Sequence, residues 1–254
     1  MARKLKLISR RSEVPQNTQV AENPIQGHSN RLKLRIDDLK TLKPLTKNQK
    51  LFFDSYNNED EAIMLYGSAG SGKTYISLYK SLEQVLDKGN AYNKVIIVRT
   101  SVPSRNIGFL PGSVDEKMSA FTEPYVQVCS DLFNRKDAYT RLVEQNHLEV
   151  ISSSYLRGCT FDNSIIIFEE FQNSNWSEAK TVLSRLGKHS KIILSGDFKQ
   201  NDLTQNRNDR SGFVELFKVA SSMNEFTLIE FDTDDIVRSK FVKSFIIACE
   251  TLGH

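Results

Sequence analysis

Cysteine is scarce in this sequence, and it follows no metal-binding pattern. Three cysteines, Cys129, Cys159 and Cys249, occur in 254 residues, and no two of them form a C-x-x-C pair. Thiols that are so few and so far apart neither cross-link a small secreted domain nor bind structural zinc. We therefore expect a fold without disulfides, in a reducing cytoplasm.

Long apolar runs and a strong net charge are missing too. No stretch approaches the roughly 20 apolar residues that span a bilayer, and the basic N-terminus lacks the apolar segment of a signal peptide. A net charge of +3 is too small to indicate a partner by itself. With 39% hydrophobic and 26% charged residues, the composition is that of a soluble globular protein, and we expect no membrane contact.

Positive charge is concentrated near the beginning of the chain. Arginines and lysines lie at positions 3, 4, 6, 10 and 11, and again at 31, 33 and 35. Residues 1–30 show no sustained apolar period, so we expect a flexible basic extension there and one domain over residues 31–254. A basic arm can attract nucleic-acid phosphates. A tail that only increases solubility fits the same composition.

The strongest motif is Gly67-Ser68-Ala69-Gly70-Ser71-Gly72-Lys73-Thr74, which matches G-x-x-x-x-G-K-[ST] at every position. An apolar run precedes this phosphate loop and a helical pattern follows it. In such a loop the backbone N–H groups and the helix N-terminus surround phosphate oxygens. We expect residues 67–74 to bind the nucleotide, with Lys73 at its β- and γ-phosphates and the Thr74 hydroxyl on Mg²⁺.

Strand-like and helix-like patterns alternate along the domain. Strands are expected at 63–66, 94–99, 148–151, 165–168, 191–194 and 226–231, and helices near 73–86, 113–133 with a break at Pro124, 176–186, 212–220 and 240–252. Continuous β-branched runs are typical of strands that are buried on both faces. The alternation predicts an α/β fold with a doubly wound, mostly parallel sheet and helices on both faces. Ligands then bind at the carboxyl ends of the strands.

Polar side chains follow two of these strands. Glu169 and Glu170 end the most apolar strand, and Gln200 follows the next one. One carboxylate can hold Mg²⁺ or its waters while the other polarises a water for attack on the γ-phosphate. We assign the metal to Glu169 and the water to Glu170, and we expect Gln200 to bond both the γ-phosphate and that water. An ordinary acidic strand end and a polar turn are the alternatives.

The nucleotide is expected to be ATP. The amide of Gln49 can pair bidentately with N6 and N7 of adenine, the geometry by which adenine is read in DNA. A glutamine on a helix surface is the alternative. No Asn-Lys-x-Asp guanine signature is present, because Asn93-Lys94 continues into an expected strand.

Together these motifs resemble the PhoH-like family of P-loop ATPases in a compact phage-type form. The resemblance runs from about residue 42 to residue 250. It rests on Pro44-Leu45-Thr46 with Gln49, the phosphate loop, Arg99, residues 108–112, Glu116-Lys117, Arg157-Gly158, residues 170–173, Gly196-Asp197 with Gln200 and Asp202, Ser211-Gly212 and residues 235–238. The family usually has Asp-Glu where this chain has Glu169-Glu170.

The resemblance implies a RecA-like P-loop NTPase domain akin to the first motor domain of superfamily one helicases. It also implies ATP hydrolysis, binding of single-stranded RNA or DNA, and homo-oligomeric rings, with a hexamer favoured. In such a ring Arg238 could act as an arginine finger on a neighbour's ATP, since charge on the γ-phosphoryl oxygens needs a further cation. Action on its own ATP, or a surface ion pair with Asp234 or Asp235, remains open.

Two functional hypotheses from different classes follow. The first is an Mg²⁺-dependent ATPase that moves on or remodels nucleic acid. The second is a nucleotide-switched interaction protein, in which slow turnover controls assembly. A small-molecule kinase is less favoured, because Glu170 is suited to activate the water that a kinase must exclude.

Overall fold

The fold was obtained as a computed structural model, which describes residues 33–252 except 59, 101–113, 157 and 198–211. For residues 114–120 it describes the backbone alone. The chain divides into the units Met1–Leu32 and Lys33–His254, and the second is the one described below. The domain boundary expected between residues 30 and 31 stays a prediction.

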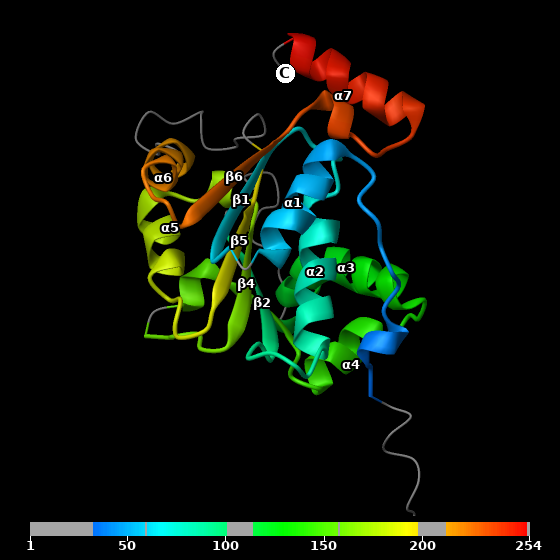
Figure 1. Ribbon diagram of the computed structural model, residues 1–254, viewed down its shortest axis with the longest axis vertical. Helices are drawn as coiled ribbons and strands as arrows, with labels where there is room; N and C mark the ends of the chain where they lie inside the picture. The colour runs from blue at the N-terminus through cyan, green and yellow to red at the C-terminus, as the bar shows by residue number, and fades with distance from the viewer. Residues whose placement is uncertain (1–32, 59, 101–113, 157, 198–211, 253–254) are drawn as a thin grey trace, which may run out of the picture. The chain divides into compact units, whose positions relative to one another are not determined.

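A parallel sheet forms the centre of the fold (Figure 1). Its order is β3-β2-β4-β5-β1-β6, and every strand pair among the described residues is parallel. The strands are β1 (Ala62–Gly67), β2 (Lys94–Arg99), β3 (Leu148–Ser152), β4 (Ser164–Glu169), β5 (Lys191–Ser195) and β6 (Phe226–Phe231). Because parallel strands end at one edge, β1, β4 and β5 present their last residues side by side.

Seven α-helices occur among the described residues. They are α1 (Lys47–Asn57), α2 (Lys73–Leu86), α3 (Val114–Phe133), α4 (Ala138–Glu144), α5 (Trp176–Leu183), α6 (Gly212–Ser221) and α7 (Lys240–Leu252). Short 3-10 helices are η2 (Ile36–Asp38), η3 (Ser153–Tyr155), η4 (Phe171–Asn173) and η5 (Thr233–Asp235). Thr46 is the N-cap of α1, since its side chain accepts a hydrogen bond from the Gln49 backbone N–H.

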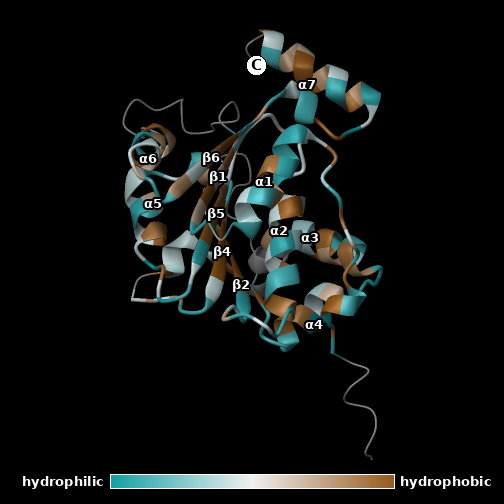
Figure 2. Cartoon of the chain, in the orientation of Figure 1, coloured by the Kyte–Doolittle hydropathy of each residue, from teal (hydrophilic) through white to brown (hydrophobic). Residues whose placement is uncertain are grey.

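Helices cover both faces of the sheet, which explains why apolar residues, brown in Figure 2, make up most of its central strands. Successive strand side chains point to opposite faces. Ile165 and Ile167 therefore join the core shared with α1–α4, whereas Ile166 and Phe168 join the core shared with α5 and α6. The α/β fold class with a doubly wound sheet and helices on both faces, expected from the sequence, is confirmed, and the described sheet is entirely parallel.

Two expectations about helices were wrong, and one helix was not expected. Helix α3 continues through Pro124 instead of breaking there. A proline inside a helix costs about 3 kcal/mol, and the buried side chains Tyr125, Cys129 and Leu132 just beyond it offset that cost. Helix α5 ends at Leu183 rather than at residue 186. Helix α4 was not expected, because its 7 residues are too few to show a clear period.

Among the helices that the structure describes, none is both long and apolar enough to cross a bilayer.

Candidate nucleotide site

The phosphate loop joins the end of β1 to the start of α2, as the motif predicts. Gly67 turns the chain out of the strand with a φ of 113°, and a Cβ there would lie 2.1 Å from the Phe231 carbonyl oxygen. The next N–H, of Ser68, donates to that same oxygen at 2.8 Å. Gly72 caps α2 in the left-handed conformation, with a φ of 82°. Glycine is required at both positions because a side chain would be strained.

Lys73 folds back into the loop that precedes it. Its Nζ donates to the carbonyl oxygens of Gly67 and Ser68, at 3.0 and 2.8 Å, and to the Ser71 hydroxyl at 3.2 Å. Burial lowers the pKa of this ammonium group, and nearby carboxylates, first that of Asp197, oppose the shift. The loop therefore holds one buried cation at its centre, where a polyphosphate would need it.

The side chains of Thr74 and Glu169, the two residues predicted to hold Mg²⁺, contact each other. The Thr74 hydroxyl donates to Glu169 Oε2 at 2.7 Å. The other oxygen, Oε1, is buried and accepts no hydrogen bond from the described residues. Burial raises the pKa of Glu169 to about 7, and the Thr74 hydrogen bond opposes this rise. An orphaned oxygen beside a hydroxyl suits a hard, oxygen-preferring cation, so these residues fit Mg²⁺.

Glu170 stands at the bend between β4 and η4, with a left-handed φ of 53°. Its Oε2 accepts a hydrogen bond from Gln172 Nε2 at 2.6 Å. The other end of that amide, Gln172 Oε1, accepts from the Asp197 backbone N–H at 3.1 Å. Gly196 leaves room for this bridge, because a Cβ there would lie 2.5 Å from Gln172 Oε1. Gln172 thus ties the Glu170 carboxylate to the end of β5.

Gln49 is buried against the phosphate loop rather than exposed on a helix surface. Its Nε2 donates to the Ser71 carbonyl oxygen at 2.9 Å, and its Oε1 accepts from the Leu45 N–H at 2.8 Å. Both ends of the amide therefore brace the loop from the start of α1. The reading of adenine by Gln49 stays a prediction.

A second brace comes from the segment after β6. The buried Asp235 carboxylate accepts hydrogen bonds from Asn48 Nδ2 at 2.7 Å and from the Asp232 N–H at 3.0 Å. Burial would raise the pKa of Asp235, but these bonds, with one from Thr46, outweigh burial and lower it. The N–H of Val237 then donates to the Gly70 carbonyl oxygen at 3.1 Å.

Arg238 lies beside the phosphate loop of its own chain. Its Cγ would be 3.0 Å, and its Nε 3.6 Å, from a Cβ placed on Gly70. Among the described residues no ion pair joins Arg238 to Asp234 or Asp235. Action of Arg238 on its own nucleotide and action on a neighbour's nucleotide both stay predictions.

Of the remaining residues singled out in the sequence, some lie in the part of the chain that the structure describes and some do not. Ala69 lies in the turn of the phosphate loop. Gln200, Arg157 and residues 108–112 lie outside the described residues. Sequence reasoning gave no role to Gln172 or Asp235, although both stand in motifs that carried the resemblance. The local sequence marks these two residues by position alone. Gln172 follows Glu170 by two residues, and Asp235 ends a capping box that begins at Asp232.

Comparisons with known proteins identify the family of this chain. A family model described as "PhoH-like protein" matches residues 41–250. A PhoH-like protein of Bacillus subtilis (strain 168) is 30% identical over 210 residues, which are 82% of this chain and 64% of that protein. Protein PhoH of Escherichia coli (strain K12) is 32% identical over 184 residues, 70% of this chain and 50% of that protein.

The chain spans slightly less than two thirds of the length of the first of these relatives, and half of the second. Among solved structures, Pif1 helicase from Candida albicans is similar with 17% identity and a TM-score of 0.39, over 84% of this chain and 44% of that one. The family match covers the phosphate loop, both strand-end acids and the Asp235 brace. On that match, this chain belongs to the PhoH-like protein family.

Proposed function

We propose that this chain binds ATP with Mg²⁺, hydrolyses it, and couples hydrolysis to binding or remodelling of single-stranded RNA or DNA. The observation that carries the proposal is one connected arrangement at the carboxyl ends of β1, β4 and β5. It joins the Lys73 cation, the Thr74–Glu169 pair with its orphaned oxygen, and the Glu170 carboxylate held by Gln172.

Each residue has a defined task in this proposal. The loop N–H groups bind phosphate oxygens, and Lys73 exchanges its carbonyl partners for oxygens at the β- and γ-phosphates. Thr74 and Glu169 hold Mg²⁺, which neutralises developing charge on the phosphates when bound. Glu170 takes a proton from the attacking water at its carboxylate, while Gln172 fixes the direction of that carboxylate.

Nucleic-acid coupling is supported by the family resemblance and by the basic residues near the N-terminus. We propose that residues 1–30 form a phosphate-binding arm on an ATPase domain of residues 31–254. A single motor domain cannot alternate its grip, so translocation needs a second motor domain or a ring of copies. We therefore also propose association of identical chains, with a hexameric ring favoured.

A second candidate, a nucleotide-switched assembly protein, is favoured by one observation. Helix α7 contacts the phosphate loop through Glu250, whose Oε1 accepts a hydrogen bond from the Ser68 hydroxyl at 2.7 Å. The same helix exposes large apolar side chains. Occupancy of the loop could therefore change a surface that binds a partner.

The deciding experiment measures ATP turnover with and without single-stranded RNA and DNA across a salt series. The first candidate predicts stimulation that falls steeply with salt, because counterions are released on binding. Turnover without stimulation favours the second. Lys73→Ala should lose turnover while remaining folded, and Lys88→Ala, an exposed lysine just beyond α2, is the matched control. A wild-type chain without Mg²⁺-dependent turnover would reject both candidates.

A further inference from the structure

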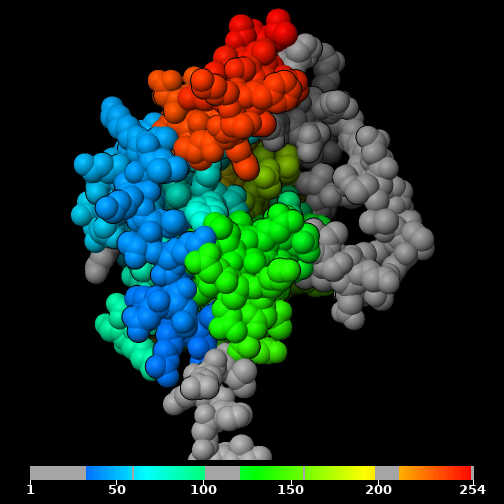
Figure 3. Space-filling view, turned by 90° about the vertical axis from the view of Figure 1, so that its right-hand side faces the viewer, coloured from blue at the N-terminus to red at the C-terminus, as the bar shows by residue number. Residues whose placement is uncertain are grey.

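Helix α7 buries none of its 13 residues, all of which the structure describes. Helices of this length are marginal alone in water, and most gain their stability by packing an apolar face. Helix α7 has such a face, because Phe241, Phe245 and Leu252 are apolar but 79%, 61% and 71% exposed. Figure 3 shows the helix, orange to red, at the surface of the molecule.

The apolar face points away from the chain's own phosphate loop. Residues 241, 245, 248 and 252 follow a spacing of four, three and four, which keeps them in one stripe on a helix that turns about 100° per residue. Residues 243, 246 and 250 form the opposite stripe. Ile246 Cδ1 would lie 3.3 Å from a Cβ on Gly70, and Glu250 binds Ser68. The inward stripe therefore contacts the loop, and none of the residues that the structure describes buries the large apolar side chains of the outward stripe.

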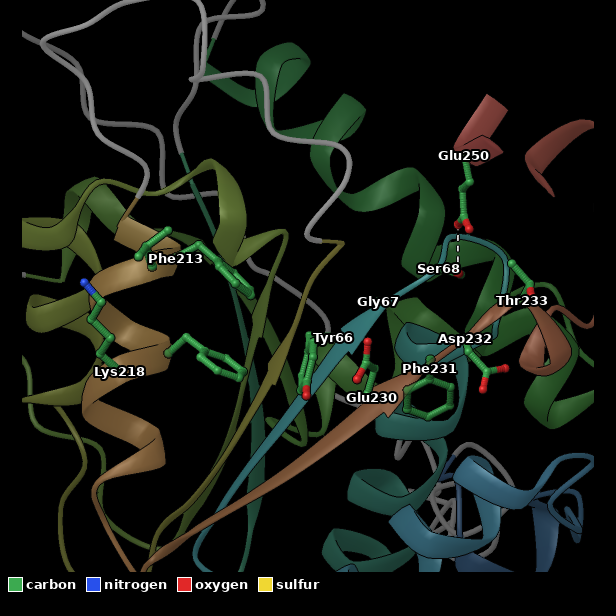
Figure 4. A pocket seen from close by; sticks show the side chains of 12 residues that line it. Tyr66, Gly67, Ser68, Phe213, Lys218, Glu230, Phe231, Asp232, Thr233 and Glu250 are labelled. Carbon is green, nitrogen blue, oxygen red and sulfur yellow. Dashed lines mark hydrogen bonds between the residues drawn. The ribbon is translucent and has the colours of Figure 1, made fainter. Parts of the chain in front are cut away.

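An aromatic cavity of about 700 Å³ lies next to the loop, between α6 and the ends of β1 and β6 (Figure 4). Its apolar lining includes Tyr66, Phe213 and Phe217, with Tyr66 edge-on to Phe217 at 5.3 Å between ring centroids. The size and lining are those of a pocket that binds large apolar groups. Two phenylalanine side chains from a helix are groups of this kind.

The charges that line this cavity indicate which kind of helix can bind in it. Three carboxylates line it, those of Glu230, Asp232 and Glu250, against the one ammonium group of Lys218. The outward stripe of α7 begins beside Lys240, and its first turns carry no acidic residue. A basic, aromatic helix therefore matches an acidic, aromatic cavity, and both surfaces belong to the same sequence.

We propose that the outward stripe of α7 docks into the aromatic cavity of a second copy of this chain. Phe241 and Phe245 enter the cavity and pack against its aromatic lining, and Lys240 faces the carboxylates of the cavity. The two surfaces differ, so the contact runs head to tail and generates a ring or a filament. This proposal rests on one part of the proposed function, the association of identical chains, and names the two surfaces that form the contact. It does not depend on ATP hydrolysis, because docking needs no nucleotide.

The test measures the mass of the full chain by sedimentation velocity over a concentration series. Phe245→Asp breaks the stripe, and Val214→Lys places a cation in the cavity at a residue that is 45% exposed. Each variant should weaken association on the order of tenfold or more, since a buried charge is costly. Leu51→Asp on α1 and Val219→Lys on α6 are matched controls at exposed apolar positions away from both surfaces, and they should associate normally.

Mixing the two defective chains identifies the kind of contact. A Phe245→Asp chain keeps an intact cavity and a Val214→Lys chain keeps an intact stripe, so the mixture should form pairs and nothing larger. A wild-type chain that stays monomeric at every concentration overturns the proposal. Association that depends on Phe245 but not on Val214 also overturns it, since stripes would then pair with each other. Two variants that are folded but form no pairs when mixed would also overturn the proposal.

ATP turnover, measured on the same samples, separates this proposal from the proposed function. A chain that hydrolyses ATP but does not associate refutes the docking alone. A chain that associates through both surfaces without turnover refutes the ATPase alone.

Discussion

The phosphate loop and helix α7 contact each other, yet they are held in opposite ways. In the loop, Ser68, Ser71 and Lys73 are all buried, and each makes hydrogen bonds within the protein. In α7 no residue is buried, and its described contacts with the loop are made by single side chains such as Glu250. Local stability follows buried contacts, so the loop is preformed while α7 opens at low cost.

We propose that this difference separates the residues of the reaction from a helix that regulates it. Groups that must meet a phosphate within tenths of an ångström are braced from α1, β5 and η5. The helix that covers the loop is instead available to respond to nucleotide or to a second copy. We therefore expect substitutions in the rigid region to have larger effects than substitutions in α7.

Replacing Glu170 should have the largest effect. Glu170→Gln removes the proton acceptor but retains an amide in its place, so nucleotide binding should persist while turnover falls about a hundredfold or more. Steady-state turnover and nucleotide affinity are measured on the same preparation. The control is Glu123→Gln, an exposed acid on α3. Unchanged turnover in Glu170→Gln would remove this residue from the mechanism.

The next largest effect is expected from Gly67→Ala, and it is an effect on stability. A Cβ at φ 113° and 2.1 Å from the Phe231 oxygen forces β1 and β6 apart, and the free energy of unfolding should fall by about 3 kcal/mol. Gly89→Ala is the matched control, because its Cβ meets only the flexible Asp87 side chain, at 3.3 Å. Chemical denaturation compares the two. Equal stabilities would mean that the tight exit from β1 is not required.

The pH dependence of Mg²⁺ binding is the third prediction. The pKa of Glu169 is raised to about 7 from 4.5, so without metal its contribution to stability is present below about 4.5 and is lost as pH rises through about 7. Mg²⁺ needs the ionised form, so its affinity should rise up to about tenfold per pH unit below 7 and then level off.

Thermal unfolding with increasing Mg²⁺, at several pH values between 5 and 8, measures this affinity without relying on turnover. Glu169→Gln should lose both the stabilisation by Mg²⁺ and its pH dependence. Stabilisation that is equally strong at every pH would place Mg²⁺ elsewhere.

The smallest effect is expected where α7 meets the loop. Glu250→Gln keeps an oxygen that accepts from the Ser68 hydroxyl but removes a negative charge beside the phosphate site. ATP affinity should rise about twofold to fivefold, the scale of a partly exposed charge interaction. Equilibrium titration with ATP in Glu250→Gln and in Glu144→Gln, an exposed acid on α4, provides the comparison. A weaker affinity would show that α7 supports the nucleotide rather than opposing it.

Local patterns were enough to predict the fold class and the core of the site. Strands such as 94–99 were recognised because sheets covered on both faces need uninterrupted apolar residues. The phosphate loop was recognised because eight consecutive residues carry its geometry. The catalytic roles of Lys73, Glu169 and Glu170 remain predictions, although the structure brings all three together.

The sequence by itself determined which groups reach the carboxyl edge of the sheet, because strand direction and strand ends are encoded locally. Only the tertiary structure decided what those groups touch. Gln49 meets Ser71, and Arg238 meets Gly70, across 22 and 168 positions of the chain. The burial that offsets Pro124, and the direction of the apolar stripe of α7, likewise depend on neighbours distant in sequence. Such contacts are set by how whole elements pack, and no spacing within one segment records them.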